Sequence, residues 1–404
     1  YKAHSRRYKG NAERKGRDMD FALSEQQIAF VDVAREFARD QLAPNAANWD
    51  EQKIFPVATI RAAGDLGFCG LYCPAEVGGI GLSRTDAALI LEELAQGCTS
   101  TAAYLSIHNM AGWMIATWGS EQVRLDWAGP LAAGTKLASY CLTEANAGSD
   151  AASIVTSARR DGEDYVLNGA KAFISGAGDT DILVVMARTG NDGPGGISAF
   201  AVPGDTPGLS FGKNEAKMGW NSQPTRAISF ENVRIPKHHL LGGEGQGFSI
   251  ARQGLEGGRI NIAACSLGAA QATLDMTQRY LSERKQFGQV LADFQALQFR
   301  LADMATELVA ARQMVYKAAW ALDSDHPEKT AYCAMAKRFA TDTGFKVCNE
   351  AMQLHGGYGY LRDFPIERFF RDARVHQILE GTNEVMRVII ARRLLQPNGT
   401  ENLK

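Results

Sequence analysis

The sequence has no uninterrupted apolar run that reaches the ~18 residues of a membrane-spanning helix. Of its 404 residues, 45% are hydrophobic and 22% are charged, which is the composition of an ordinary globular protein. The length is typical of two or three domains. We therefore expect a multidomain globular protein that is not inserted in a membrane.

Cysteine and histidine occur in patterns that exclude two classes of site. The seven cysteines are odd in number and form no Cys-x-x-Cys pair, so the sequence predicts neither a disulfide framework nor a zinc site, and a reducing compartment fits best. No His-Glu-x-x-His motif is present, and His238 and His239 are adjacent, whereas metal ligands on one helix need a spacing of three or four residues. We expect no metal centre.

A Rossmann dinucleotide site also finds no support in the sequence. The glycines between 242 and 247 do not fit Gly-x-Gly-x-x-Gly, and they do not follow a strand of a βαβ unit. This glycine cluster is more typical of a joint between domains.

Outside the first 18 residues, acidic residues outnumber basic ones. Residues 1–18 carry seven lysines and arginines against two acids, which leaves 36 basic and 43 acidic residues in the remainder. Such an acidic body lacks the basic footprint of a nucleic-acid-binding protein. We interpret residues 1–18 as a tag or disordered leader before a natural start at Met19, with a transit-peptide remnant as the alternative, and leave the segment out of the fold.

Helical signals fill the first part of the chain. Ser24 to Gln27 have the form of a capping box, and apolar residues follow at helical spacing until Pro44. Further helical patterns cover 57–66, 85–96, 111–118 and 121–131. These segments predict an N-terminal α-helical domain over residues 19–137.

The pattern changes to short β-rich runs after residue 137 and returns to helix after the glycine cluster. The runs ASYCLTE, YVLNG, DILVVMAR, GISAFAVP and RAISFENVRIP predict a central β domain over 138–244. One seam in three-four alternation then predicts a helix of an antiparallel bundle over 245–404. The seam consists of Phe294, Leu297, Leu301, Met304, Leu308, Ala311, Val315, Ala318 and Leu322. We expect any chemistry where the β domain meets the helices.

The segment QILEGTNEVMR, residues 377–387, places the carboxylate of Glu380 among apolar residues and Gly381. One interpretation is structural, because Thr382 or Asn383 can cap a following helix and an acid near a helix start favours its dipole. The other is chemical, because a carboxylate that loses water has a raised pKa and is a better general base. The segment alone leaves both interpretations open.

The segment YCLTEANAGSD, residues 140–150, runs from a strand into a loop with hydroxyls and glycine. Such a loop exposes groups that can hold a pyrophosphate or the edge of a flavin, although a turn without a ligand fits it equally well. Phe173 in KAFISGAG, Arg284 in ERKQFG and the glycines of QLHGGYG offer a ring, a cation and close backbone approach. Each of these signals is weak by itself.

Together these segments resemble the acyl-CoA dehydrogenases over the chain from Met19 to about Gln396. The resemblance rests on YCLTEANAGSD, KAFISG, GLEGGRINIA, ERKQFG, QLHGGYGY and QILEGTNEVMRVIIARRLL, in that order. It implies an α+β, mainly α fold with an N-terminal helical domain, a β-barrel-like central domain and a C-terminal four-helix bundle. One departure is that Ala145 and Asn146 replace the usual Pro-Gly, so the loop lacks a stiffening proline.

The resemblance also implies FAD, bound between the β domain and the bundle. Positions that match flavin contacts within one subunit are Tyr140, Leu142, Thr143, Gly148, Ser149, Phe173, Ile174 and Ser175. Positions that match contacts to the FAD of a neighbouring subunit are Arg284, Gln286, Phe287, Phe294, Gln295, Gln353, Gly356 and Gly357. Thr382 and Glu384 would close the site. A homotetramer built from paired dimers follows from this pattern.

For the substrate, the resemblance implies an acyl-CoA thioester and makes Glu380 the catalytic base. The matching substrate positions are Ser149, Glu256, Gly257, Gly258, Arg259 and Arg392. Related enzymes that act on isovaleryl-CoA carry their glutamate where this sequence has Gly258. The segments GCTSTAAYLSIHNM, GAGDTDILVVMARTG and GWNSQPTRAISFE are most similar to the branch that oxidises isobutyryl-CoA in valine breakdown. Tyr104 and Met110 are expected to form walls of a short, wide acyl pocket.

The implied electron acceptor is electron-transferring flavoprotein. The alternatives are an acyl-CoA oxidase, which passes electrons to oxygen, a dehydrogenase that prefers 2-methylbutyryl-CoA or a short straight-chain thioester, and a helical scaffold protein that uses the long seam for partners. The expected location is the cytoplasm for a bacterial protein and the mitochondrial matrix for a eukaryotic one.

Overall fold

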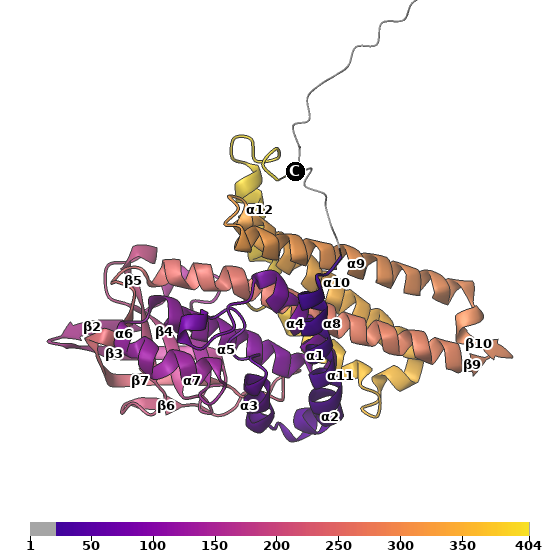
Figure 1. The fold of residues 1–404 in the computed structure, drawn as a ribbon, viewed down its shortest axis with the longest axis horizontal. Helices are drawn as coiled ribbons and strands as arrows, with labels where there is room; N and C mark the ends of the chain where they lie inside the picture. The colour runs from indigo at the N-terminus through magenta and orange to yellow at the C-terminus, as the bar shows by residue number, and fades with distance from the viewer. Residues whose placement is uncertain (1–21, 404) are drawn as a thin grey trace, which may run out of the picture.

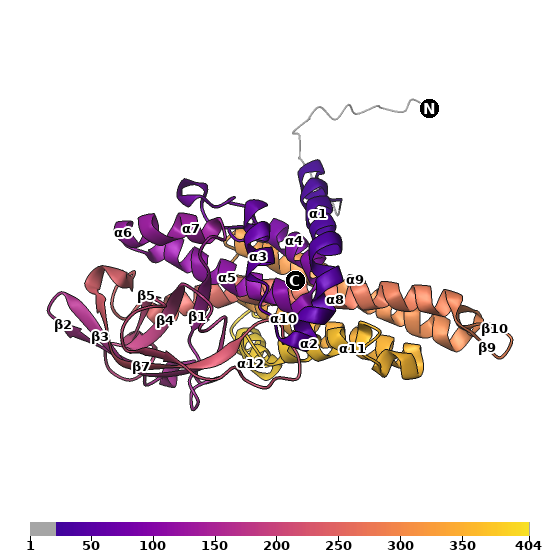
Figure 2. The ribbon, with the colours of Figure 1, turned by 90° about the horizontal axis from the view of Figure 1, so that it is seen from below.

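The computed structural model describes residues 22–403, so the predictions for residues 1–18 and for a start at Met19 lie outside the described residues. Helices come first along the chain, a sheet follows, and a second set of helices completes the fold (Figure 1). The sheet lies at one end of the molecule and the small hairpin β9–β10 at the other, and a view from a perpendicular direction shows the same separation (Figure 2).

The N-terminal helices begin with the predicted capping box. The Ser24 hydroxyl accepts from Gln27 N, and the Gln27 side chain accepts from Ser24 N, so the prediction at this helix start is confirmed. The helices are α1 Glu25–Phe37, α2 Ala43–Gln52, α3 Val57–Asp65, α4 Arg84–Gly97, α5 Thr99–Trp118, α6 Glu121–Val123 and α7 Gly129–Ala132.

Helix α5 is longer than its sequence pattern predicted. The pattern indicated a helix over 111–118, whereas α5 begins at Thr99. Its side chains are buried on almost every side, so apolar residues follow one another without a helical period. Because α5 is buried on almost every side, the first half of the helix shows no helical periodicity in the sequence and was not predicted.

The β domain is an open sheet of eight strands. They are β1 Ala138–Cys141, β2 Ser157–Asp161, β3 Asp164–Ser175, β4 Ile182–Arg188, β5 Ile197–Pro203, β6 Leu209–Phe211, β7 Thr225–Pro236 and β8 Leu240–Leu241. The order is β6-β7-β3-β2-β4-β5-β8, and β1 pairs with β4 in parallel. The end strands β6 and β8 do not pair with each other, so the expected barrel-like closure is corrected to an open, mixed sheet.

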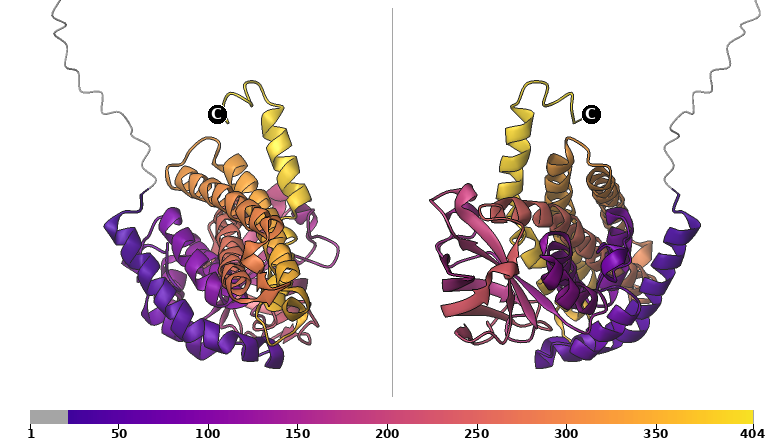
Figure 3. Two further views of the ribbon diagram at one scale, coloured as in Figure 1. Left: turned by 90° about the vertical axis from the view of Figure 1, so that its right-hand side faces the viewer. Right: turned by 60° about the vertical axis from the view of Figure 1, so that its left-hand side comes forward.

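The C-terminal part is helical, as predicted. Its elements are α8 Gly247–Glu283, β9 Lys285–Gln286, β10 Gln289–Val290, α9 Gln295–Asp323, α10 Lys329–His355, α11 Ile366–Arg374 and α12 Asn383–Leu394. The predicted seam is confirmed, because its central residues from Met304 to Ala318 are buried on α9. Helix α10 packs against α8 and α9, and α12 projects from the group (Figure 3).

Helix α8 joins the two halves of the molecule. It packs against α4 and α5 of the N-terminal part and against α9 and α10 of the C-terminal part, and its first turns lie on β5. Close approach depends on Gly268, since a side chain there would meet the Glu92 carbonyl at 2.1 Å. The region around α8 is therefore where a site shared by the sheet and the helices can form.

No helix among residues 22–403 is long and apolar enough to cross a membrane. Within the same residues, no group of His, Cys, Asp and Glu side chains is arranged to hold a metal ion. All seven cysteines are unpaired and buried.

A buried ion pair fixes the loop after β1. The Lys171 ammonium, which is fully buried, donates to Glu144 Oε1 at 2.7 Å and to Leu142 O at 3.0 Å. The Glu144 carboxylate also accepts from Val155 N and Thr156 N. Burial acts to raise the pKa of Glu144, but these hydrogen bonds outweigh it and hold the pKa below its usual value.

We expect Glu144→Ala to destabilise the protein by about 3 kcal/mol, because it leaves the buried Lys171 charge without its acid. The loss should fall at the lower end for a broken buried pair, since Leu142 O still accepts from Lys171. Urea and thermal denaturation measure it. As a control, Glu163→Ala breaks an exposed pair with Lys237 and should leave the melting temperature unchanged. Equal melting temperatures for both variants would contradict the prediction.

Candidate active site

Glu380 lies in a short loop between α11 and α12. Its backbone and that of Gly381 are both left-handed, with φ of 57° and 90°. Thr382 then caps α12, because its hydroxyl accepts from Val385 N at 3.3 Å. The structural interpretation of this segment is confirmed for Thr382, while Glu380 itself stays outside the helix cap.

The Glu380 carboxylate is enclosed against helix α8. Its Oε2 atom is buried and has no hydrogen-bond partner among the described residues. A Cβ atom added to Gly258 would lie 2.1 Å from that oxygen, so only glycine leaves room for the carboxylate here. Arg259 Nε donates to the backbone oxygen of Glu380 at 3.4 Å. Burial raises the pKa of Glu380 to about 7, against the opposing charges of Arg259 and Lys337.

Two further buried atoms near this point lack partners within the described chain, namely Tyr140 OH and Arg259 Nη1. Burial raises the pKa of Tyr140, and the Glu380 charge adds to that effect while Arg259 reduces it. Buried polar atoms are nearly always hydrogen-bonded, so three orphans at one place indicate a polar ligand.

The loop after β1 and the end of β3 lie side by side. Thr143 O accepts from Ala172 N at 2.9 Å, which places the hydroxyl loop next to the Phe173 backbone. Phe173 has a left-handed φ of 58°, and its side chain is 69% exposed. Gly148 is exposed and no atom lies within 4 Å of the place where its side chain would be.

The other residues that were predicted to contact the flavin of their own subunit range from buried to exposed. Leu142 and Ile174 are buried, Ser149 is exposed, and Ser175 O accepts from Ser139 Oγ at 2.7 Å. An exposed ring, an open glycine loop and orphaned polar atoms at one domain junction fit a flat heterocycle with polar edges. The residues present therefore fit the isoalloxazine of FAD.

A second group of predicted residues lies at the far end of α8. They line a cavity of about 620 Å³, together with Tyr280, Arg300 and Tyr358; the predicted members are Arg284, Gln286, Gln353, Gly356 and Gly357. Phe287, on the adjoining hairpin, is 94% exposed, and its ring lies 6.2 Å from that of Phe294. Gln295 is exposed at the start of α9.

These two groups do not meet within one chain. The helical rise of ~1.5 Å per residue puts Arg284 about 37 Å along α8 from Arg259. That separation is much longer than an FAD molecule, so a single cofactor cannot contact both groups in one protomer.

The predicted substrate residues divide into a buried and an exposed set. Glu256 is buried and accepts a hydrogen bond from Thr330, and Gly258 and Arg259 adjoin Glu380. Arg392 is exposed in the last turn of α12. Glu384, predicted to close the flavin site, is also exposed, and its carboxylate pairs with Arg387 at 3.4 Å. The structure thus brings Gly258 and Arg259 to Glu380 and leaves Arg392 and Glu384 on the surface.

The two predicted pocket walls have different surroundings. Met110 Sδ lies 3.1 Å from the Cβ position of Gly258 and so adjoins the carboxylate. Tyr104 is fully buried in the core, where its hydroxyl donates to Ala138 O and its ring packs edge-on against Phe55. Of the two, Met110 therefore lies next to Glu380.

A cation beside Gly257 was not predicted from the sequence. The Arg84 guanidinium lies 3.5 Å from the Tyr72 ring centroid and 4.8 Å from that of Trp113. Its Nη1 is 2.4 Å from the Cβ position of Gly257, so this glycine makes room for it. An arginine at the first residue of a helix does not indicate, from the sequence alone, that it will lie against a glycine of another helix.

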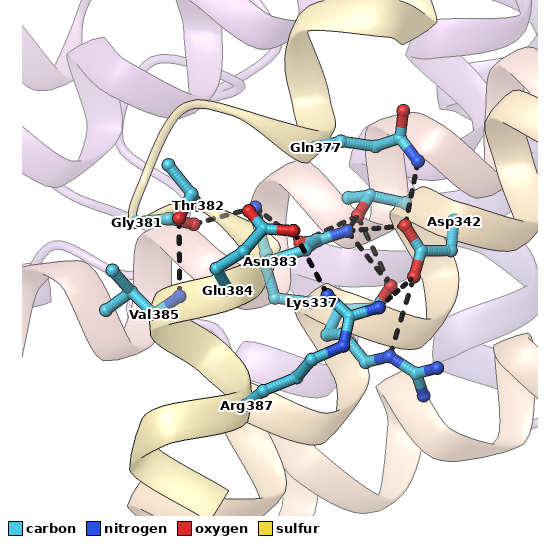
Figure 4. Close-up of polar contacts among 11 residues, drawn as sticks. Lys337, Asp342, Gln377, Gly381, Thr382, Asn383, Glu384, Val385 and Arg387 are labelled. Atoms are coloured by element: carbon cyan, nitrogen blue, oxygen red, sulfur yellow. Dashed lines mark hydrogen bonds and ion pairs between the residues drawn. The ribbon is translucent and has the colours of Figure 1, made fainter. Parts of the chain in front are cut away.

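Lys337 was missed as well, although a lysine on the apolar face of a helix was the available signal. Its ammonium, fully buried on α10, donates to Gly381 O and Asn383 Oδ1, both at 2.8 Å. Figure 4 shows Lys337 directed toward the loop that precedes α12.

Comparison with known proteins places this chain in a family. Residues 24–135, 139–233 and 245–395 match the N-terminal, middle and C-terminal domain models of acyl-CoA dehydrogenases. The chain is 56% identical to a mitochondrial isobutyryl-CoA dehydrogenase of Bos taurus, over 94% of this chain and 91% of that protein. It is 53% identical to the protein of the same name in Dictyostelium discoideum, over 92% and 90% of the two chains.

A solved structure agrees with these sequence matches. The structure of butyryl-CoA dehydrogenase from Megasphaera elsdenii superimposes with a TM-score of 0.91 at 40% identity, covering 94% of this chain and all of that one. The chain therefore belongs to the acyl-CoA dehydrogenase family of oxidoreductases.

Proposed function

We propose that this enzyme catalyses the FAD-dependent α,β-dehydrogenation of isobutyryl-CoA to methacrylyl-CoA, a step of valine catabolism. The observation that carries the proposal is the buried, unpartnered Oε2 of Glu380 beside Gly258. The branch of the family is supported by the two relatives named isobutyryl-CoA dehydrogenase, which are 56% and 53% identical to this chain over the aligned residues.

In the proposed reaction, Glu380 removes the proton from the α-carbon of the thioester. A hydrogen bond to the thioester carbonyl acidifies that proton, and Tyr140 OH and Arg259 Nη1 are unpartnered donors nearby. The hydride that leaves the β-carbon is taken up by FAD when the cofactor is bound. One proton and one hydride thus leave the substrate, and a carbon–carbon double bond forms.

The proposed FAD site is built from two chains. Tyr140 to Ser149 and Phe173 to Ser175 would hold the flavin of their own subunit. The cavity around Arg284 would take the adenine-nucleotide half of the partner's FAD, because it is too far along α8 to serve the same cofactor. Shared cofactors support paired dimers and a homotetramer.

Reduced flavin must pass its electrons on, and we propose electron-transferring flavoprotein as the acceptor. A mitochondrial matrix location is proposed if the protein is eukaryotic, in line with the mitochondrial relatives, and a cytoplasmic one if it is bacterial.

Glu380→Gln should keep FAD and the assembly but lose activity by at least ~10²–10⁴-fold, because the amide cannot accept the α-proton. For the unsubstituted enzyme, kcat/KM should rise with pH through about 7 as Glu380 deprotonates. Turnover with an artificial electron acceptor and the flavin absorbance measure both. Glu163→Gln, far from the loop, serves as the control. Near-normal turnover by Glu380→Gln would refute its role.

Arg284→Ala should weaken FAD retention, because the guanidinium lines the cavity and would meet the pyrophosphate. Flavin content after gel filtration at decreasing protein concentration tests this. Arg279→Ala, an exposed arginine one turn earlier on α8, is the matched control. Full flavin content in the Arg284 variant at the lowest concentration would rule out the proposed contact across subunits.

The substrate preference should be isobutyryl-CoA first, 2-methylbutyryl-CoA or butyryl-CoA next, and octanoyl-CoA hardly at all. Met110 beside Gly258 closes the pocket near the base, but one methylene contributes only ~1–3 kcal/mol to discrimination, so the related short thioesters should still react. Steady-state assays of the four thioesters check the order. Octanoyl-CoA as the fastest substrate would refute the short pocket, and rapid peroxide formation in air would favour an oxidase.

A further inference from the structure

Lys337 is a buried cation that the proposed reaction does not use. It is fully buried, and no carboxylate of the described residues lies within 4.0 Å of its Nζ atom. Its partners are neutral oxygens, those of Gly381 and Asn383. A buried charge without a paired acid is costly, so a role for this lysine beyond packing needs to be considered.

Both partners follow directly after the proposed base. Glu380 adopts a left-handed backbone, which is unfavourable for an L-residue and persists only where the surroundings impose it. The bond from Lys337 to Gly381 O holds the next peptide unit, and the bond to Asn383 Oδ1 holds the start of α12. Lys337 therefore acts on the backbone that aims the Glu380 side chain.

The same helix also holds the loop on its other side. Asp342 Oδ1 accepts from Gln377 Nε2 at 2.8 Å and from Asn383 Nδ2 at 2.7 Å. Figure 4 shows the Gln377 and Asn383 side chains meeting Asp342 of α10. Helix α10 is thus the platform for the whole segment 377–383.

We propose that Lys337 is a positioning residue for catalysis: its ammonium fixes the left-handed turn at Glu380 and Gly381, and its charge favours the ionised form of the base. This inference rests on the proposed function, because it takes Glu380 as the base.

The charged groups around this pair set the direction of the effect. Glu380 faces two cations, Arg259 from α8 and Lys337 from α10. Burial lowers the pKa of Lys337 to about 8, and its charged neighbours modify this value. Those neighbours are Glu380, Arg259, Asp342 and Glu384, with the buried His376 also coupled to it. Removing the Lys337 charge takes a favourable field from the carboxylate, so the pKa of Glu380 should rise.

The test compares Lys337→Met, Lys337→Arg and, as a matched control on the same helix, Lys346→Met, whose lysine is exposed and pairs with Glu307. Flavin content, melting temperature, and kcat and KM across pH are measured for each. Lys337→Met should keep its flavin and lose about 10- to 100-fold in kcat with little change in KM. Its acid limb, which is the rise of kcat with pH at the acidic end of the profile, should lie at higher pH than in the unsubstituted enzyme. Lys337→Arg keeps the charge with a different donor geometry, so kcat should fall while the acid limb stays in place.

Wild-type kcat together with an unmoved acid limb in Lys337→Met would overturn the inference. If that variant does not fold, Lys337→Arg decides, because wild-type kcat in it would equally refute positioning. The comparison with Glu380→Gln separates the two proposals. Normal turnover by Glu380→Gln removes the proposed function and this inference together, whereas an inactive Glu380→Gln beside a normal Lys337→Met removes this inference alone.

Discussion

The site depends on burying the Glu380 carboxylate away from water without pairing it directly with a cation. Glu380 Oε2 is pressed against α8 at the one point where Gly258 leaves space for it. Burial alone would make this acid too weak to ionise, and a direct salt bridge would make it too weak a base. Arg259 and Lys337 act on it from beyond ion-pair distance, so its pKa settles near neutrality. The backbone contacts of these two cations then serve a second purpose, since they hold the loop.

The length of α8 governs the rest of the architecture. Its first half carries the residues around Glu380, and its last turn leads into the cavity of Arg284. Because the helix is continuous from Gly247 to Glu283, these two groups are held apart along it by a distance that one cofactor cannot span. An FAD contacted by both groups would require a second chain, so the proposed cofactor binding and the proposed assembly depend on the same helix.

Elements whose signals are local could be predicted from the sequence. The capping box at Ser24, the seam from Met304 to Ala318 and the β-rich runs each follow from spacing within one segment. The start of α5 could not be predicted, because burial on all sides removes the helical periodicity of its apolar residues. Whether the sheet closes could not be predicted either, because closure depends on pairing between strands that are distant in the sequence. For the site, motif order predicts Glu380 as the base, and that role stays a proposal. The contacts of Lys337 and Arg84 join residues far apart in sequence and have no local signature.

The loop with Ala145 and Asn146 shows how a departure from a family pattern is accommodated. Proline would stiffen this turn by fixing one backbone angle. Here Glu144 and Ala147 exchange backbone hydrogen bonds across the turn, at 3.1 and 3.2 Å, while residues 145 and 146 are exposed. The Glu144 side chain is bound to Lys171 and to two backbone N–H groups beneath the turn. Because the loop is anchored through Glu144, rigidity at the proposed flavin edge does not require a proline, and the exposed positions of the turn are free to vary.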